Sequence, residues 1–361
     1  MLAGPHCRTR TAVRTLVMSF AVVAVAATTL AAQQQSSFRL ESAVTLAGAS
    51  PSWDYVTLDT MHGRLFIGRR KLGVTAFDLA SGKVLRQIAR SEEANATALV
   101  PAFDRGYTTN EDGSTTVFTL STLETIDRIK FGDDADAAVF EPRSGQVAFM
   151  MGDSKAVKFL DARTGAVRGT LAMRSAKLDG AVTDDDGTIF VAQRDRNAMA
   201  RIDASAHRLT GEWKTTGCEQ PTGLAIDRVA HRLFIGCRGT HPVLAVMDAR
   251  TGKVVATLPI GRGNDGVAYD AVRHQVLTSN GVDANVVTFN QITPDRYALA
   301  EAFTTRPYAR TMAFDPRTRK LYLVTAEGAV DVSRPVKGDV APFYPNFYFD
   351  DSFTLLTYSH R

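Results

Sequence analysis

Short apolar runs alternate with turn residues along this chain, and they recur with a regular spacing. The runs are rich in Val, Ile, Leu and Phe, and Gly, Asn, Asp or Ser stands between them. This pattern is typical of antiparallel β-strands, because branched and aromatic side chains fit a pleated sheet and small polar residues fit tight turns. Residues 55–59, 64–68, 74–78 and 83–88 are four such runs. They predict one small antiparallel sheet.

A motif of alternating small and apolar residues, opened in most copies by a polar residue, returns seven times. Its copies begin at positions 54, 95, 136, 179, 222, 265 and 310, at intervals of 41, 41, 43, 43, 43 and 45 residues. A nearly constant interval in the forties, with strand-like content, indicates a radial all-β repeat. The sequence therefore predicts an all-β fold, a seven-bladed β-propeller of four-stranded antiparallel blades.

The two ends of the repeat region predict how the ring closes. Residues 38–46 form a strand with no three strands before it, and the last period, which begins at position 310, ends in a strand-like run at 353–358. An open ring would leave edge strands exposed to other chains. We therefore expect the N-terminal strand to complete the C-terminal blade.

Aspartates precede a turn in several of the predicted sheets, often with Thr-Gly or Ser-Gly downstream. A short side-chain acceptor at such a position bonds backbone N–H groups further along, and Gly supplies a positive φ. We expect a structural role for these acids, which are Asp78, Asp161, Asp203 and Asp248.

Residues 1–32 have the pattern of a secretory signal peptide. Arg8, Arg10 and Arg14 precede an apolar stretch at 16–27, and small residues follow. Twelve apolar residues are too few to span a bilayer comfortably, although an uncleaved anchor is an alternative. We expect cleavage, a single propeller domain over residues 38–361, and a periplasmic or secreted location.

The charge balance bears on the partners. The chain has a net charge of +4, and the leader carries three arginines and no acid, so the mature part is at +1. A net charge near zero gives no reason to expect nucleic acid or an anionic membrane as partner. We expect a monomer without a membrane span that binds a small molecule or an envelope protein.

Parts of several repeats resemble a known family. Residues 54–58, 232–236 and 248–254 are similar to the repeats of the YVTN-repeat β-propellers, which include the YncE-like secreted proteins of Gram-negative bacteria. The likeness covers all seven periods and is specific for the fold but weak for function. It implies an exported propeller that is used for binding.

The residue that opens each inner strand is expected at one mouth of the central channel. Across the blades these residues are Asp54, Asn95, Asp136, Asp179, Thr222, Asp265 and Arg310. With Arg310 as the only local counter-charge, the four carboxylates would repel one another, which raises pKa values or attracts a cation. A solvated or loop-capping role is the alternative. Trp53, Tyr55 and Tyr308 would lie beside this ring, where they either form the floor of a ligand pocket or, as we favour, pack between neighbouring blades.

Three hypotheses for function follow from this ring. The favoured one is a binding protein that recognises a small ligand or an envelope partner at an acidic mouth. The second is a metal-dependent hydrolase of lactonase type, in which Ca²⁺ or Mg²⁺ is held by Asp54, Asn95, Asp136, Asp179 and Asp265. The third is a structural or cofactor-carrying module. No cofactor is established, and no catalytic residue is assigned.

Cys218 and Cys237 are the only cysteines that remain after cleavage of the leader. Antiparallel pairing around the turn at 229–231 brings position 237 opposite residues 221–223, within reach of the loop that carries Cys218. Export favours oxidation, so we expect a disulfide that contributes about 3 kcal/mol. Two free thiols or a soft-metal site are the alternatives.

Overall fold

The computed structural model of the chain describes residues 1–2, 4, 37–48, 52–331, 333 and 345–361. The chain divides into two units, and all strands belong to the unit Ser36–Arg361. The predicted leader, residues 1–32, lies outside the described residues apart from three positions near its start. Within the described ranges, no helix is both long enough and apolar enough to cross a bilayer.

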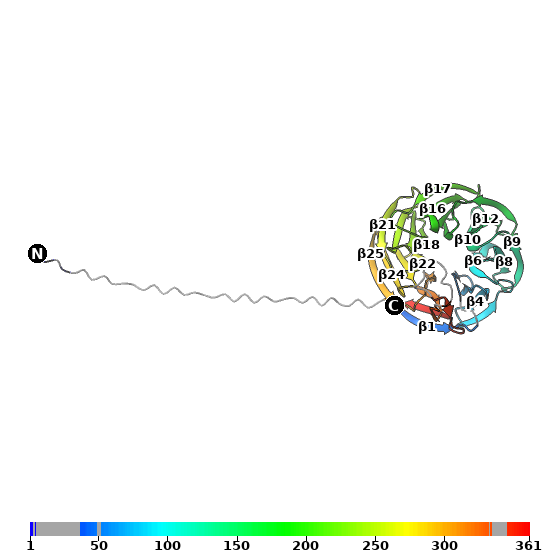
Figure 1. The fold of residues 1–361 in the computed structure, drawn as a ribbon, viewed down its shortest axis with the longest axis horizontal. Coiled ribbons are helices and arrows are strands. Elements are labelled where there is room, and N and C mark those ends of the chain that lie inside the picture. The colour runs from blue at the N-terminus through cyan, green and yellow to red at the C-terminus, as the bar shows by residue number, and fades with distance from the viewer. Residues whose placement is uncertain (3, 5–36, 49–51, 332, 334–344) are drawn as a thin grey trace. The chain divides into compact units, whose positions relative to one another are not determined.

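The described residues form seven four-stranded antiparallel sheets that are arranged radially, as Figure 1 shows. The predicted seven-bladed propeller is therefore confirmed. The first three sheets contain β2 (Val56–Asp59), β3 (Arg64–Gly68), β4 (Val74–Asp78) and β5 (Lys83–Gln87); β6 (Ala94–Val100), β7 (Arg105–Asn110), β8 (Ser114–Thr119) and β9 (Thr125–Lys130); and β10 (Ala135–Glu141), β11 (Gln146–Met151), β12 (Ala156–Asp161) and β13 (Val167–Ala172).

The next three sheets have the same order from the axis outward. They contain β14 (Leu178–Thr183), β15 (Thr188–Gln193), β16 (Ala198–Asp203) and β17 (Arg208–Lys214); β18 (Pro221–Asp227), β19 (Arg232–Cys237), β20 (Val243–Asp248) and β21 (Val254–Pro259); and β22 (Asn264–Asp270), β23 (Gln275–Asn280), β24 (Asn285–Thr293) and β25 (Arg296–Thr304). Two short 3₁₀ helices, η1 (Pro101–Phe103) and η2 (Arg194–Arg196), follow inner or second strands.

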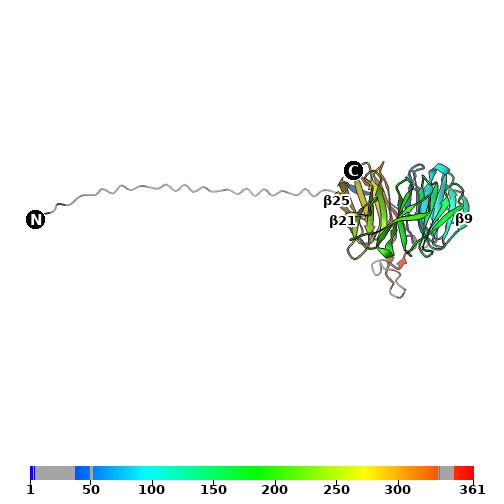
Figure 2. The same ribbon diagram turned by 90° about the horizontal axis from the view of Figure 1, so that it is seen from above.

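The seventh sheet combines both ends of the propeller. β26 (Met312–Asp315), β27 (Lys320–Thr325) and β30 (Thr354–His360) are joined by β1 (Phe38–Thr45), which pairs antiparallel with β30 at the rim. The expected closure by the N-terminal strand is confirmed. A two-stranded sheet of β28 (Gly328–Ala329) and β29 (Phe347–Tyr348) lies between β27 and β30 in sequence, within the irregular part of the last period. Figure 2 shows the blades from the side.

Burial changes from the second strand to the outer strand of each blade. All residues of β11, β15 and β19 are buried, whereas every residue of β5 is exposed. Second strands are nearly continuous apolar runs because neighbouring blades cover both of their faces. Residues of outer strands such as β13 and β21 are half-buried or exposed. This gradient orients each blade, so that its inner strand lines the axis.

Inner strands of adjacent blades approach each other closely at their starts. The backbone N–H of Tyr55 donates to the carbonyl of Asn95 at 3.0 Å. A Cβ placed on Gly68 would lie 2.0 Å from the same carbonyl oxygen. The glycine at the end of β3 is therefore required for blade packing.

The four turn aspartates have the structural role that the sequence predicts. Oδ1 of Asp161 accepts hydrogen bonds from the backbone N–H groups of Arg163 at 3.0 Å and Thr164 at 2.8 Å. Asp78, Asp203 and Asp248 accept equivalent bonds within their own turns. These acids serve the outer turns and belong to no ligand site.

Candidate functional site

One mouth of the ring collects residues from two places in each blade. The second strand runs antiparallel to the inner strand, so it ends where the inner strand begins. Accordingly, the backbone N–H of Asp54 donates to the carbonyl of Gly68 at 2.9 Å, and Pro221 pairs with Cys237. A residue that follows the second strand therefore lies beside a residue that opens the inner strand.

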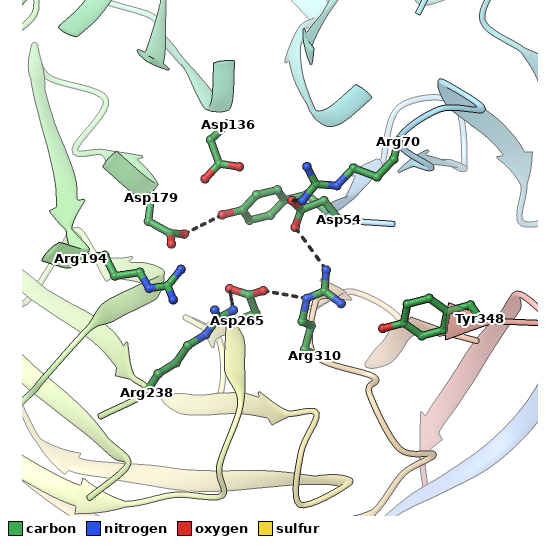
Figure 3. Close-up of a pocket in the computed structure, with 10 residues that line it drawn as sticks. Asp54, Arg70, Asp136, Asp179, Arg194, Arg238, Asp265, Arg310 and Tyr348 are labelled. Atoms are coloured by element: carbon green, nitrogen blue, oxygen red, sulfur yellow. Dashed lines mark hydrogen bonds and ion pairs between the residues drawn. The ribbon is translucent and has the colours of Figure 1, made fainter. Parts of the chain in front are cut away.

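A cavity of about 270 Å³ lies at this mouth, and Figure 3 shows the side chains around it. Five of the seven predicted ring residues line it, namely Asp54, Asp136, Asp179, Asp265 and Arg310. They come from five different blades. The expected convergence of distant segments on one hollow is confirmed for these five, whereas their role in binding stays a prediction.

The remaining two ring residues do not line this cavity. Asn95 and Thr222 are fully buried. The Asn95 amide donates to the carbonyl of Ala135 at 3.0 Å, and the Thr222 hydroxyl donates to the carbonyl of Asn264 at 3.0 Å. Both side chains turn sideways and bond to the inner strand of the next blade. Their role in ligand binding stays a prediction, because neither side chain lines this cavity, and the Asn95 amide oxygen is buried without a hydrogen-bond partner among the described residues.

Two of the three predicted aromatic residues lie outside the cavity. Trp53 is only 1% exposed, and its ring packs against Phe353 and under the Arg310 guanidinium, which lies 5.0 Å from the ring centroid. Tyr308 borders a separate cavity of about 290 Å³ and packs against the core of the first and last blades. Packing, the favoured interpretation, is observed for both residues. Tyr55, the third predicted aromatic residue, lines the cavity together with Tyr348.

Three arginines at the mouth were missed by the sequence analysis. Arg70, Arg194 and Arg238 line the cavity together with Arg310, so the expectation of Arg310 as sole counter-charge is wrong. Arg194 and Arg238 directly follow a second strand, and Arg70 follows one at a distance of two residues. The signal was present in the sequence, since antiparallel pairing carries these positions to the starts of the inner strands.

Two of the four aspartates are neutralised by these arginines. Asp265 forms ion pairs with Arg238 and with Arg310, whose Nε lies 2.9 Å from Oδ2. Asp54 lies 2.5 Å from Nη2 of Arg70 and 4.0 Å from Nη2 of Arg310. Burial nevertheless raises the pKa of Asp54, and the attraction of Arg70 and Arg310 opposes that rise. Such pairs fix the arginine side chains in place.

The other two aspartates are not neutralised in this way. The Asp136 carboxylate has no hydrogen-bond or ion-pair partner in the described part of the chain. Oδ1 of Asp179 accepts from the Tyr55 hydroxyl and from the backbone N–H of Gly180, both at 3.0 Å. Burial raises the pKa of Asp136 well above its usual value, and the nearby charges of Asp179 and Asp54 add to the rise. Burial also raises the pKa of Asp179, and the negative charge of Asp265 raises it further.

Two further cavities adjoin the charged one. A cavity of about 650 Å³ shares Arg70, Asp136, Asp179, Arg194 and Arg238 with it and extends along polar residues that include Lys177 and Gln220. A third, of about 190 Å³, shares Tyr55 and Asp265 and is lined mainly by small and apolar residues of the inner strands. The charged cavity therefore adjoins a large polar cavity on one side and a small, mainly apolar cavity between the inner strands.

The metal hypothesis requires several carboxylate and amide oxygens to converge on one ion. Among the described residues, no group of three or more His, Cys, Asp or Glu side chains lies close enough to hold a metal ion. The acids of the proposed metal set have other partners: Asp54 and Asp265 bind arginines, and Asn95 points away from the cavity. The residues present therefore do not fit the single-ion site that the metal hypothesis requires.

Cys218 and Cys237 form a disulfide with a Cα–Cα distance of 5.4 Å. The prediction is confirmed, and the free-thiol and soft-metal alternatives are excluded for the oxidised protein. Cys237 ends β19 and directly precedes Arg238. The bond therefore anchors the loop before β18 to the strand whose end carries one of the mouth arginines.

The fold and this mouth define a class: a seven-bladed β-propeller whose inner strands present a charged, partly enclosed cavity. No family model and no curated protein matches the sequence, so the resemblance to the YVTN-repeat family stays a prediction. Solved structures with the same fold include Kuenenia stuttgartiensis hydrazine synthase, with a TM-score of 0.65, 14% identity, and coverage of 78% of this chain and 94% of that chain.

Two other structures are similar over most of the chain. A chain of the mitotic checkpoint complex has a TM-score of 0.70 and 13% identity, with coverage of 96% and 99%. The Cps50 (Swd1) β-propeller domain of Myceliophteria thermophila has a TM-score of 0.68 and 11% identity, with coverage of 90% and 100%. At such low identities these likenesses show the fold alone.

Proposed function

We propose that this protein is an exported binding protein that recognises a small polar ligand at the charged mouth of its central channel. The observation that carries the proposal is the Asp136 carboxylate, which lines the cavity and has no side-chain partner among the described residues. Asp136 is half-buried, and a carboxylate that is partly desolvated without a partner destabilises the fold. A ligand that donates hydrogen bonds to the Asp136 carboxylate would offset this cost.

The scaffold supports this role. The lining comes from several blades whose inner strands are fixed by hydrogen bonds to their neighbours, so the cavity is formed before any ligand arrives. A preformed site loses little conformational entropy on binding. The combination of a larger polar cavity and a few fixed charged groups is typical of small-molecule sites.

Export rests on two features. The leader pattern at residues 1–32 predicts secretion, and the Cys218–Cys237 disulfide suits an oxidising compartment. A periplasmic or secreted location, and membership of the YVTN-repeat family, belong to this proposal. N-terminal sequencing of protein from a fractionated culture tests it: a mature chain that begins near residue 33 in the periplasm supports export, and an intact leader in the cytoplasm contradicts it.

Ligand binding is tested on the mature protein as purified. We expect native mass spectrometry of the protein, or a thermal-shift panel of polar metabolites, to reveal at least one bound compound. Asp136→Asn should abolish the shift. Asp186→Asn is the matched control, because Asp186 is an exposed aspartate outside the cavity. A panel that leaves the melting temperature unchanged, with no co-purifying compound, contradicts the proposal.

A metal-dependent hydrolase and an envelope-protein partner were the other expectations for this mouth. No observation in the described residues favours either over a small ligand, so neither is proposed here. The chelator EDTA separates the first from our proposal: a binding protein of the kind described keeps its melting temperature when EDTA is added, whereas a metal-held site loses stability.

A further inference from the structure

We propose that the ligand carries an ammonium group with N–H donors, which Asp136, Asp179 and Tyr55 hold at the mouth. This inference rests on the proposed function, since it names the chemical class that the same cavity accepts. The three residues line the cavity together, and Figure 3 shows the carboxylates of Asp136 and Asp179 on one side of it.

The cavity holds carboxylate oxygens that are placed to accept hydrogen bonds from a ligand. Arginines engage Asp54 and Asp265. Asp179 is only 7% exposed, and its Oδ1 is used by Tyr55 and Gly180, while its Oδ2 has no partner within the described ranges. Asp179 lines the cavity, so its Oδ2 is placed to accept a hydrogen bond from a ligand donor.

Tyr55 supplies a third acceptor. Its hydroxyl donates to Asp179, so the lone pairs of its oxygen remain for a donor from the ligand. Burial raises the pKa of Tyr55 well above its usual value, and the charge of Asp179 adds to the rise. The phenol therefore stays protonated and keeps this orientation.

The number and type of these acceptors select an ammonium group. A primary ammonium has three N–H donors, which matches Asp136, Oδ2 of Asp179 and the Tyr55 oxygen. A Ca²⁺ ion needs about six to eight oxygens at about 2.3–2.6 Å. The described residues offer no such group. Next to Asp136 and Asp179, where the proposed acceptors lie, an inorganic anion would be repelled by the two carboxylates.

Charge balance explains how the site stays stable when it is empty. The lining holds four aspartates and four arginines. Asp136 faces Asp179, Asp54 and Asp134, with Arg70 as the opposing cation, and its pKa is raised. Burial and neighbouring acids raise the pKa of both Asp136 and Asp179, which favours a bound proton in the empty site that an ammonium group would replace. Binding should release a proton and weaken as the pH falls.

The rest of the ligand would extend into the adjoining cavity of about 650 Å³, which shares Asp136 and Asp179 with the charged one. Its lining includes Asp134, Lys177 and Asn197. Polar walls of this kind favour a hydroxylated or otherwise polar body over an aliphatic chain. The inferred class is therefore a small, polar organic amine.

Calorimetry with three matched probes tests the inference on the mature protein. Ethanolamine has N–H donors and a positive charge, choline has the charge without N–H donors, and ethylene glycol has neither. We expect ethanolamine to bind at least about tenfold more tightly than choline, and ethylene glycol not to bind. Repeating the ethanolamine titration in buffers of different ionisation enthalpy should reveal proton release.

Variants separate this inference from the proposed function. Asp136→Asn should weaken ethanolamine binding at least about tenfold, and Asp186→Asn should leave it unchanged. If the protein binds other polar metabolites but shows no preference for ethanolamine over choline, the ammonium assignment is wrong and the binding function stands. If it binds neither ethanolamine nor any metabolite, both proposals are wrong. Circular dichroism of each variant verifies that it is folded.

Discussion

Replacing Asp265 by asparagine keeps the size of the side chain and removes the charge that holds two arginines. The Asp265 side chain is 9% exposed, and those of Arg238 and Arg310 are 10% and 15% exposed. Without the carboxylate, two nearly buried guanidinium groups lose one counter-charge. Removing one partner of a buried ion pair costs about 3–5 kcal/mol, because the remaining charge is left desolvated.

Other contacts reduce this cost for Asp265→Asn. Nε of Arg238 still donates to the carbonyl of Asn264 at 2.6 Å, and Nη2 of Arg310 to that of Trp53 at 2.8 Å. The adjacent cavity also admits solvent. We therefore expect a loss of about 2–4 kcal/mol in the free energy of unfolding. For a propeller of this length that corresponds to a fall of about 3–6 °C in melting temperature.

Asp136→Asn is the matched substitution, and the opposite sign is expected. Asp136 has no partner to lose within the described part of the chain, and its charge is opposed by burial and by Asp179. Burial raises its folded-state pKa well above the ordinary value of an aspartate, so the folded state binds the proton more tightly than the unfolded state. The penalty is absent below that value and grows as the pH rises through the folded-state pKa. Asp136→Asn should therefore stabilise the protein near neutral pH and have little effect in acid.

Urea denaturation of both variants and the wild type, at neutral and at acidic pH, measures these differences. Tryptophan fluorescence suits the assay, because Trp53 is buried beside Arg310. A loss of less than about 1 kcal/mol for Asp265→Asn would refute the assignment of the arginine cluster as a buried ion-pair network. Destabilisation by Asp136→Asn at neutral pH would refute the unpartnered state of that carboxylate.

Three further predictions concern the scaffold. The Cys218–Cys237 disulfide joins residues 19 positions apart, and its reduction should lower the free energy of unfolding by about 3 kcal/mol. A melting scan with and without a phosphine reductant measures this loss. The Cys218→Ser/Cys237→Ser double variant is the control, and its melting temperature should not respond to the reductant. A chain shortened to residues 47–361 lacks β1 and exposes the edge of β30, so we expect aggregation in size-exclusion chromatography; a stable monomer would contradict closure by β1. Gly68→Ala should lower the free energy of unfolding by about 2 kcal/mol, because the added Cβ would lie 2.0 Å from the Asn95 carbonyl oxygen. Urea titration measures this loss. An unchanged midpoint would show that the two blades move apart easily at this contact.

The architecture was accessible from the sequence because it depends on local pattern. The seven copies of the inner-strand motif, the turn acids such as Asp161, and the unmatched strand at 38–46 are each readable without knowledge of distant contacts. Antiparallel pairing around one turn was also sufficient to place Cys237 near Cys218. Such features follow from strand period, turn chemistry and repeat length.

Only part of the site could be predicted from the sequence. Asn95 and Asp136 hold the same position in the repeat, yet Asn95 bonds to the next blade and Asp136 faces the cavity. The repeat fixes where a residue lies along its strand but not which way its side chain turns. Contacts with the neighbouring blade decide that direction.

The blade count, the closure of the ring, the disulfide and the arrival of four aspartates at one mouth followed from the order of residues along the chain. Which of those aspartates pair with arginines depended on the assembled blades. Coulomb energy and desolvation vary with the distances between blades, and Arg70, Arg194 and Arg238 reach those distances only after the strands have paired and the ring has closed.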